Sequence, residues 1–441
     1  MAYTTYEVIQ YVEENDVKFI KLFFTDIFGS IRSISVQPSM LKKAFDSGIS
    51  FDASSVPGYL TVEKSDLLLK PDPSTLTVLP WRPQHGRVAR LYCNIVYPDG
   101  KPFEGDSRYI LQQTAEKALK MGYEVKVGTE CEFYLFKLDE NGKPTDIPYD
   151  NAGYCDLAPW DKGENIRRDI ILNMEQMGIE PQTSHHETGP GQNEVDFKYD
   201  NAINSADNFA TFKTTVYTIA ARDGAAASFD PKPFMDKPGS GLHLNISIYR
   251  DGKNLFTEKS KESQNFLAGV LNRIREISIF LNSKDSSYKR LGAFEAPEII
   301  SWSEQNRSAL VRIPAAEGDS CRMELRSPDP SCNQYLGIAS VIQAGLEGIE
   351  KSIELPPPLD LNLSHVFEIR NCVNFGFESV SISESLESDK NMKDLIKKYG
   401  GLPLNLDEAL NLACESDFVK TFIPESLLTS LKKLYSTHNY R

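Results

Sequence analysis

The chain has 441 residues, of which 40% are hydrophobic and 25% are charged, an ordinary composition for a soluble globular protein. This length exceeds what one compact core usually holds, so about two domains are expected. Its 62 acidic residues outnumber 48 basic ones and give a net charge of −14, which argues against a nucleic-acid partner because phosphate binding requires a basic surface.

Two further classes, secreted proteins and membrane-spanning proteins, are not expected from the sequence. The first residues include no positively charged segment followed by an apolar one, and no window approaches 18 apolar residues. The sequence therefore predicts no signal peptide and no membrane span. Its seven cysteines are scattered without a Cys-x-x-Cys pair, which indicates reduced thiols in a cytoplasmic protein and argues against a thiolate zinc site.

The N-terminal part of the chain is predicted to be mostly β. Residues 17–36 are rich in β-branched and aromatic side chains and predict a hairpin, and residues 75–97 contain a further strand signal. The stretch 97–106 is rich in Pro, Gly and Asp and predicts a loop. We place a domain boundary in this loop, which divides the chain into domains at 1–103 and 104–441.

The second domain is predicted to alternate strands and helices. One helix is expected to begin with Ser107 as its N-cap and to end before Gly122. Another is expected within 164–177, ending before Gly178. The proline run 356–358 marks a later break in regular structure.

Four predicted strands place polar side chains on one face in the same unusual way. Residues two apart in a strand share a face, and the intervening residues face the other side. Any one of these strands, taken alone, is typical of a solvated sheet surface. The four sets are Glu130 with Glu132, Glu194 with Asp196, His243 with Asn245 and Ser247, and Arg322 with Glu324 and Arg326.

Glycine-rich loops next to two of these strands favour a buried site over a solvated face. The segments "ETGPGQNE" and "PGSGLH" allow close approach of the backbone, which a water-facing strand does not need. If the four strands are neighbours, their four glutamates and Glu187 of the first loop converge with one histidine, and divalent cations would neutralise the repulsion between these carboxylates. Carboxylate oxygens with a single imidazole suit Mg²⁺ or Mn²⁺.

Five arginines follow within a short stretch. Their planar guanidinium groups bind phosphate and carboxylate oxygens in pairs, and phosphoryl transfer requires such cations beside metal ions. The chain has neither a GxxxxGK[ST] nor a GxGxxG motif, so it is neither a P-loop nor a Rossmann phosphate site. A metal-dependent hydrolase could use the carboxylates and the histidine but would not need these arginines. They are Arg290, Arg307, Arg312, Arg322 and Arg326.

Seven segments in order resemble the type I glutamine synthetase family. They are "FDASSVPGY", "ECE", "SHHETGPGQNEVDFKY", "KPFMDKPGSGLHLNIS", "YKRLGAFEAP", "NRSALVRIP" and "RMELRSPDP". The resemblance extends from about residue 15 to 350 and is weak after about 360. It implies an α+β protein, with a small β-grasp-like N-terminal domain and a large C-terminal catalytic domain that has a curved antiparallel sheet and helices.

The resemblance also implies a reaction and an assembly. ATP would phosphorylate the γ-carboxylate of L-glutamate, and ammonia would displace the phosphate to give L-glutamine. Members of the family form dodecamers of two hexameric rings with active sites between adjacent subunits. Two or three Mg²⁺ or Mn²⁺ ions would be bound per site.

Metal and substrate roles follow from the resemblance by position. His243 would usually be a hydrogen-bonding group within a strand, but its glycine-rich approach and family position favour metal ligation. One metal site would consist of Glu132, Glu187 and Glu194, and the other of Glu130, His243 and Glu324. Arg290 and Arg326 would clamp glutamate with the backbone of Gly239. Phosphates would contact Arg307 and Arg312 with Arg322 nearby, and the adenine and ribose end would contact Tyr199 and Ser247.

The ammonium site and the flap also have counterparts in this chain. Asp52 of the neighbouring subunit would take a proton from ammonium. Glu295 resembles the flap residue that closes over glutamate and shields the acyl phosphate from water. Tyr154, Glu187 and Ser55 would complete the ammonium pocket.

Three departures from the family pattern lie near the amino-acid and ammonia end. Ala53 replaces a usual glycine, Pro238 replaces an asparagine, and the loop from Arg290 to Glu295 is one residue short. They leave open a glutamate–amine ligase of the same superfamily, which attaches larger amines to glutamate. A non-catalytic assembly protein of this fold is a further alternative, although no expected ligand has been lost. The acidic ammonium pocket favours glutamine synthetase itself.

Regulation by two family mechanisms is not expected. The tyrosine segment that some members adenylylate is not recognisable in 391–410, and Thr61 stands where others have an arginine for glutamine feedback. We therefore predict no adenylylation and weak inhibition by glutamine.

Overall fold

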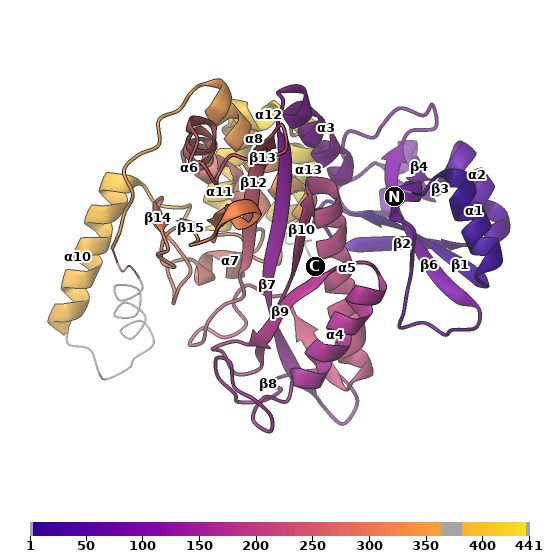
Figure 1. Cartoon of the computed structure of the whole chain (residues 1–441), viewed down its shortest axis with the longest axis horizontal. Helices are drawn as coiled ribbons and strands as arrows, with labels where there is room; N and C mark the ends of the chain where they lie inside the picture. Colours follow the sequence, from indigo (N-terminus) through magenta and orange to yellow (C-terminus); the bar gives the residue numbers. More distant parts are fainter. Residues whose placement is uncertain (1–2, 362, 364–381, 438–441) are drawn as a thin grey trace.

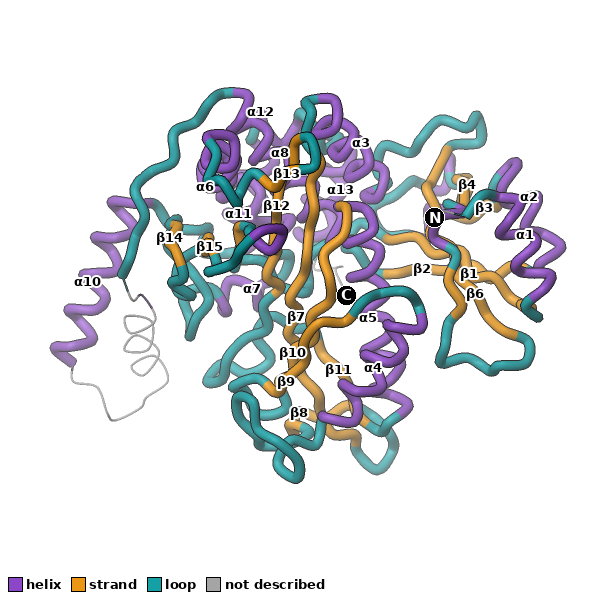
Figure 2. Tube along the Cα trace, viewed as in Figure 1, coloured by secondary structure: helices purple, strands orange, loops and turns teal. Residues whose placement is uncertain are grey.

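The computed structural model describes residues 3–361, 363 and 382–437. It contains two sheets, with the smaller N-terminal sheet at one end of the molecule and α10 at the other (Figure 1). Long helices pack behind the larger sheet, whose strands run through the centre of the molecule (Figure 2). Among the described helices, none combines the length and apolar composition that crossing a membrane requires.

The N-terminal sheet confirms the strands predicted for this region. The predicted hairpin at 17–36 is formed by β1 and β2, which pair antiparallel, while β1 pairs parallel with β6. Its core consists of alternating apolar side chains such as Ile20, Leu22 and Leu91, which are fully buried. The strand order is β2 (Ile31–Val36), β1 (Val17–Thr25), β6 (Arg87–Val96), β4 (Asp66–Pro71) and β3 (Ile49–Asp52), with β5 (Thr77–Val78) on β6; α1 (Thr5–Glu14) and α2 (Leu41–Ser47) belong to the same region.

The second sheet has ten strands and crosses the larger part of the molecule. Its described strand pairs are antiparallel as expected, except that β14 and β15 run parallel. The strand order is β14 (Trp302–Glu304), β15 (Val311–Ile313), β16 (Met323–Leu325), β12 (Leu242–Arg250), β7 (Glu124–Leu138), β10 (Gln192–Asn201) and β9 (Pro181–His186). Strands β8 (Pro144–Pro148) and β11 (Ala225–Ser228) pair with β7, and β13 (Lys253–Asn254) pairs with β12.

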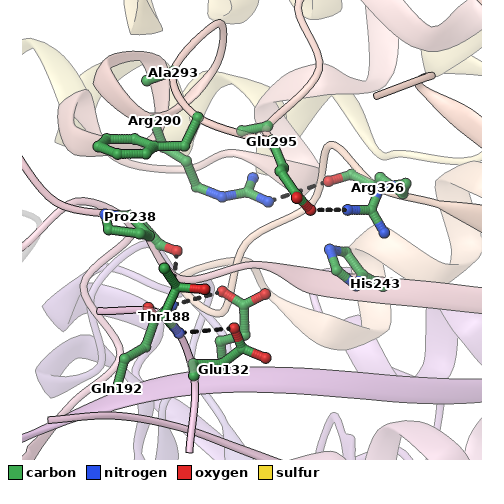
Figure 3. A pocket seen from close by; sticks show the side chains of 13 residues that line it. Glu132, Thr188, Gln192, Pro238, His243, Arg290, Ala293, Glu295 and Arg326 are labelled. Carbon is green, nitrogen blue, oxygen red and sulfur yellow. Dashed lines mark hydrogen bonds and ion pairs between the residues drawn. The ribbon is translucent and has the colours of Figure 1, made fainter. Parts of the chain in front are cut away.

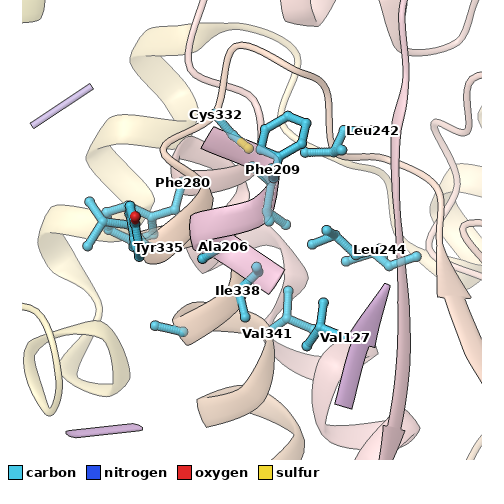
Figure 4. Packing of buried hydrophobic residues seen from close by; sticks show 14 of the residues in the cluster. Val127, Ala206, Phe209, Leu242, Leu244, Phe280, Cys332, Tyr335, Ile338 and Val341 are labelled. Carbon is cyan, nitrogen blue, oxygen red and sulfur yellow. The ribbon is translucent and has the colours of Figure 1, made fainter. Parts of the chain in front are cut away.

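One face of this sheet is packed against helices α5 and α8. Val127 of β7 and Leu244 of β12 meet Phe209 of α5 with Ile338 and Val341 of α8 (Figure 4), and each of these side chains is at most 1% exposed. Burying apolar side chains of this size contributes about 2 kcal/mol each. Since strand side chains alternate, the intervening residues must point to the opposite face.

Helices of the second part have the following bounds. They are α3 (Ser107–Lys120), α4 (Glu164–Gln176), α5 (Ala202–Arg222), α6 (Lys261–Leu281), α7 (Asp285–Arg290), α8 (Gln334–Glu350), α10 (Ile382–Tyr399), α11 (Leu406–Glu415), α12 (Asp417–Lys420) and α13 (Glu425–Ser436). Short 3₁₀ turns occur at Pro38–Met40, Ala53–Ser55, Val62–Lys64, Pro73–Thr75 and Gly318–Ser320.

The start of α3 differs by one residue from the prediction. Asp106, not Ser107, is the N-cap, and its carboxylate accepts from the backbone N–H of Arg108 at 3.0 Å. The second carboxylate oxygen accepts from the N–H of Ile95 at 2.9 Å, a contact that Ser107 could not make. The expected end before Gly122, the helix at 164–176 and the break at 356–358 are confirmed.

A buried ionic network joins the two sheets. The guanidinium of Arg108 lies 2.9 Å from carboxylate oxygens of both Asp72 and Asp207, and the Tyr335 hydroxyl donates to Asp207 at 2.6 Å. Arg108 is 3% exposed, so its charge depends on these partners. The network fixes the N-terminal sheet against α3, α5 and α8.

Candidate active site

The four polar strands are neighbours in the large sheet, in the order β16, β12, β7 and β10. Their register places His243 and Asp196 on either side of Glu130, and Glu194 beside Glu132. Asn245 pairs with Glu324 on the other side of β12. The predicted convergence of carboxylates and the histidine on one sheet face is therefore confirmed.

This polar face lines one long cleft that consists of three connected cavities. The central cavity encloses about 700 Å³. It shares Glu132, Glu187 and Arg326 with a cavity of about 210 Å³ at one end. At the other end it shares Glu130 and Arg322 with a cavity of about 310 Å³. The central cavity therefore connects the two end cavities, which share no lining residue with each other.

The predicted ligand set of Glu130, His243 and Glu324 is brought together. Donor atoms of Glu130, His243 and Glu324 lie within 4.8 Å of one another, and the His243 Nδ1 atom is 3.4 Å from a Glu130 oxygen. Burial alone would raise the pKa of Glu130, but hydrogen bonds from His243 and Asn245 and the charges of His243 and Arg322 lower it to about 2. A carboxylate that stays charged beside an imidazole is a good ligand for a divalent cation.

The second ligand set includes a residue that the sequence analysis missed. The donor atoms within 4.8 Å are those of His185, Glu187 and Glu194. Glu132 lines the same cavity, but one of its oxygens accepts from the N–H of Gly241 at 2.9 Å and from the amide of Gln192 at 3.0 Å. His185 stands opposite Glu194 in the pairing of β9 with β10, and its position two residues before Glu187 was the signal in the sequence.

The electrostatics of the second set fit a divalent cation. Burial and the charges of Asp196, Glu132 and Glu187 raise the pKa of Glu194 to about 11. Among the described residues, no lysine or arginine forms an ion pair with Glu132 or Glu194, and a buried Asp196 oxygen has no hydrogen-bond partner. Carboxylates in this state are either protonated or bound to cations. Their oxygen-rich donor set matches a hard divalent cation.

The end of the cleft assigned to glutamate contains the predicted Arg290, Arg326, Gly239 and Glu295. Arg326 donates to Glu324 and lies 3.7 Å from Glu295 (Figure 3). Arg290 is 3% exposed and donates to the carbonyls of Ser327 and Arg326 at 2.8 and 3.2 Å. A Cβ at Gly239 would lie 2.3 Å from the Pro231 carbonyl oxygen, so the backbone approaches here as only glycine allows.

The remaining arginines lie between the ligand sets and the opposite end. Arg307, Arg312 and Arg322 all line the central cavity. Arg312 donates to Glu324 at 2.7 Å, and Arg322 donates to Asn245 at 2.7 Å. Tyr199 and Ser247 line the end cavity together with Arg322, where the sequence analysis expects adenine and ribose.

The predicted ammonium residues are only partly brought together by one chain. Tyr154 lines the central cavity, with its ring edge-on to His185 at 5.3 Å between centroids. Asp52 is exposed at the end of β3 and accepts from the Ser55 hydroxyl at 2.7 Å. Neither Asp52 nor Ser55 is among the described residues that line the cleft. Their contribution from a neighbouring subunit stays a prediction.

Comparisons with known proteins decide the family. Family models match the β-grasp domain of glutamine synthetase at residues 16–98 and its catalytic domain at 104–376. The chain belongs to the glutamine synthetase family. A glutamine synthetase from Clostridium saccharobutylicum is 46% identical over 402 residues, which cover 88% of this chain and 91% of the relative. One from Methanosarcina mazei is 42% identical over 433 residues, which cover 97% and 92%.

Solved structures of the glutamine synthetase fold agree with this assignment. A Plasmodium falciparum glutamine synthetase superimposes with a TM-score of 0.81 at 25% identity and covers 100% of this chain and 98% of its own. A GmaS/ADP complex superimposes with a TM-score of 0.82 at 26% identity and covers 98% and 96%. The resemblance read from seven motifs and the predicted fold class are therefore confirmed.

The chain contains a third group of possible metal ligands. These residues already have hydrogen-bond and ion-pair partners within the protein. Asp150, Asp161 and His186 lie within ligand distance of one another and are buried. His186 is 2.9 Å from Asp150, and Asp161 pairs with Arg167. Because His186 precedes Glu187, this buried group anchors the segment that presents Glu187 and His185 to the cleft.

Proposed function

We propose that this protein catalyses the ATP-dependent ligation of ammonia to L-glutamate, which yields L-glutamine, ADP and phosphate through a γ-glutamyl phosphate intermediate. The observation that carries the proposal is the convergence of two carboxylate and histidine groups with a row of arginines on one cleft. Its relatives at 42–46% identity are named glutamine synthetase. A hydrolase would not need the arginines, and a non-catalytic relative would not need to retain the ligands.

The cleft would hold two or three Mg²⁺ or Mn²⁺ ions. Glu130, His243 and Glu324 would bind one, and Glu132, Glu187 and Glu194 another, with His185 beside them. When bound, such ions offset the negative charge of the transferred phosphoryl group. The arginines at the ATP end would bind its phosphates, and Tyr199 and Ser247 its adenine and ribose; these arginines are Arg307, Arg312 and Arg322.

At the other end, Arg290, Arg326 and the backbone of Gly239 would hold glutamate. Asp52 of the neighbouring subunit would remove a proton from ammonium, which makes ammonia available as the nucleophile. Hydrogen bonds from Ser54 and Ser55 lower the pKa of Asp52, so this carboxylate is charged at neutral pH and attracts ammonium. Tyr154, Glu187 and Ser55 would complete this pocket.

Glu295 would close over the bound glutamate after both substrates have entered. Closure excludes water while the acyl phosphate exists. We further propose a division into domains at 1–103 and 104–441, a cytoplasmic location and a dodecamer of two hexameric rings. The absence of adenylylation and weak glutamine feedback also stay predictions.

A panel of nucleophiles tests the proposal. The purified enzyme is supplied with ATP, glutamate and Mg²⁺, and then with ammonium, methylamine, ethanolamine, putrescine or spermidine. We expect ammonium to give the highest kcat/KM for ADP release, with glutamine identified by mass spectrometry. ADP release that needs both glutamate and ammonium separates a synthetase from a hydrolase.

The glutamate–amine ligase is the second outcome of this panel. The relatives named glutamine synthetase do not favour it, but the departure at Pro238 lines the amino-acid end, and Ala53 would lie beside the ammonium site if a neighbouring subunit supplies Asp52. A polyamine or ethanolamine that exceeds ammonium in kcat/KM would replace the proposed substrate and leave the proposed phosphoryl transfer in place.

A further inference from the structure

Lys232 is a buried lysine behind the wall of the amino-acid end of the cleft. The residue is only 5% exposed. The ammonium nitrogen lies 4.4 Å from the centroid of the Phe294 ring and donates to the carbonyl of Lys237. Among the described residues, no acidic side chain forms an ion pair with it. Its direct partners are therefore a ring face and a backbone carbonyl, which are weaker than a carboxylate, while burial and the charge of Arg290 lower its pKa and the more distant charge of Asp236 raises it.

The first partner belongs to the flap, residues 291–296, which carries Glu295. The N–H of Ala296 donates to the carbonyl of Ala293 at 3.1 Å and closes a tight turn. Phe294 within this turn has a φ of +55°, a conformation that costs free energy for a bulky side chain. The ammonium group over the Phe294 ring gives this turn a contact from outside the flap, in addition to the contact of Arg326 with Glu295.

The second partner belongs to the loop at 230–240, which carries Gly239 and also Lys232 itself, so this bond closes the loop internally. The N–H of Ser240 donates to the Pro231 carbonyl at 2.9 Å and closes the base of this loop. Pro238 comes directly after Lys237 in this loop, and its carbonyl accepts from the Tyr134 hydroxyl at 2.6 Å. One ammonium group therefore touches both the flap and this loop.

These two segments face each other across the amino-acid end. Figure 3 shows Ala293 and Glu295 on one side of the cavity and Pro238 and Gln192 on the other. Gln192 donates to the Gly239 carbonyl at 3.1 Å and to Glu132 at 3.0 Å. A displacement of the loop would therefore disturb the carboxylate of Glu132 as well as the binding of glutamate.

We propose that Lys232 is a positioning residue that ties the flap carrying Glu295 to the loop carrying Gly239, so that the amino-acid end closes as one unit. The inference rests on the proposed function. In a loosened site, water attacks the acyl carbon of γ-glutamyl phosphate, the bond from that carbon to the phosphate oxygen breaks, and glutamate and inorganic phosphate leave. ATP is then consumed without amide formation.

The test compares a variant that removes the buried Lys232 with one that removes Lys213, a half-buried lysine. Lys232→Met keeps the length and apolar volume of the side chain but removes its charge and donors. Lys213→Met is the matched control, because Lys213 also donates to a carbonyl, that of Pro330 at 2.7 Å, and lies 5.4 Å from the Phe229 ring centroid, yet it does not line the cleft. ADP and glutamine are measured in the same reaction, together with KM for glutamate and for ATP.

The wild type is expected to form equal amounts of ADP and glutamine. Lys232→Met should form about half as much glutamine as ADP and raise the KM for glutamate about tenfold, as expected for losing a cation–π contact and a hydrogen bond. Its KM for ATP should stay within about twofold of the wild type, because the nucleotide end is remote from the loop. Lys213→Met should stay fully coupled, and Lys232→Arg should restore most of the coupling.

Two results would overturn the inference. Equal amounts of ADP and glutamine with an unchanged glutamate KM in Lys232→Met would show that the lysine does not act through the flap. If that variant does not fold, Phe294→Leu removes the ring alone and should show the same uncoupling, and full coupling there would refute the proposal. A wild type that makes no glutamine would instead overturn the proposed function.

Discussion

Two acidic residues, one from each sheet, are held in opposite electrostatic environments. Asp52 at the end of β3 is exposed, and hydrogen bonds from the hydroxyls of Ser54 and Ser55 lower its pKa. Glu194 in β10 is 9% exposed, and burial with neighbouring carboxylates raises its pKa to about 11. The first carboxylate is charged without help, whereas the second becomes charged at neutral pH only when cations offset its neighbours.

This difference separates two roles for one functional group. An acid that accepts a proton from ammonium must be charged before its substrate arrives, and hydrogen bonds in a solvated position provide that charge. An acid that binds a metal ion gains its partner with the ion, so the protein can bury it at the expense of stability. Removing charge or cations should therefore affect the two sheets very differently.

The largest effect is expected from Glu324, which is fully buried beneath the cleft and accepts from Arg312 and Arg326. Glu324→Ala should lower ATP turnover by about 1000-fold or more, because a metal ligand and the partner of Arg312 and Arg326 are lost together. Glu324→Gln keeps the side-chain volume and should lose nearly as much. ADP release and chromatographic size are measured side by side, and the assembly is expected to persist. Normal turnover in either variant would contradict the metal assignment.

Asp52→Asn should lower glutamine formation about 100-fold, since the proton acceptor for ammonium is lost. The asparagine oxygen can still accept from the N–H of Ser54. If Asp52 serves the neighbouring subunit, mixed assemblies of Asp52→Asn and Glu324→Ala chains should regain activity, because some sites receive both intact residues. Mixtures as inactive as each variant alone would place Asp52 elsewhere.

Cations should stabilise the buried site and leave the exposed acid unaffected. Mg²⁺ or Mn²⁺ at about 100 times its Kd should add about 3 kcal/mol to the free energy of unfolding, and a chelator should reverse the gain. Thermal melts of the wild type, Glu194→Gln and Asp52→Asn measure it. The gain should shrink in Glu194→Gln and persist in Asp52→Asn, and the opposite pattern would reverse the comparison between the two sheets.

The smallest effect is expected at the serines beside Asp52. Removing both hydroxyls by Ser54→Ala and Ser55→Ala should move the pKa of Asp52 upward toward its ordinary value, with the backbone N–H of residue 54 still donating. At pH 7 the carboxylate stays ionised, so kcat should change by less than about twofold. Because its pKa is lowered in the folded chain, Asp52 contributes stability above the unfolded-state pKa that is lost as pH falls through the folded-state pKa; in the variant this contribution should be smaller and its loss complete at a higher pH. A pH–rate profile whose acidic limb does not move would contradict this assignment.

The sequence predicted the ligand face well because the alternation of a strand is a local property. Glu130 and Glu132 must share a face in any strand, and so must His243 and Asn245. The hairpin at 17–36 and the helices ending near Gly122 and Gly178 were equally readable, because turn and cap residues act on their immediate neighbours. The N-cap of α3 was placed one residue late, because the second contact of Asp106 is with Ile95 on another strand.

The pairing between strands could not be predicted from local sequence. The position of His185 beside Glu194 depends on the register of β9 against β10, and the parallel pairing of β14 with β15 depends on the path of the chain between them. The buried pair of His186 and Asp150 joins residues 36 positions apart. Lys232 begins the segment "KPFMDKPGSGLHLNIS", but the motif gave it no role, and its contact with the Phe294 ring exists only in the folded chain.

By itself the sequence determined which side chains could act together within each strand, because backbone geometry repeats every two residues. Only the tertiary structure decided which strands lie side by side, because that order is set when the apolar face of the sheet packs onto α5 and α8 and turns the acidic face toward the cleft.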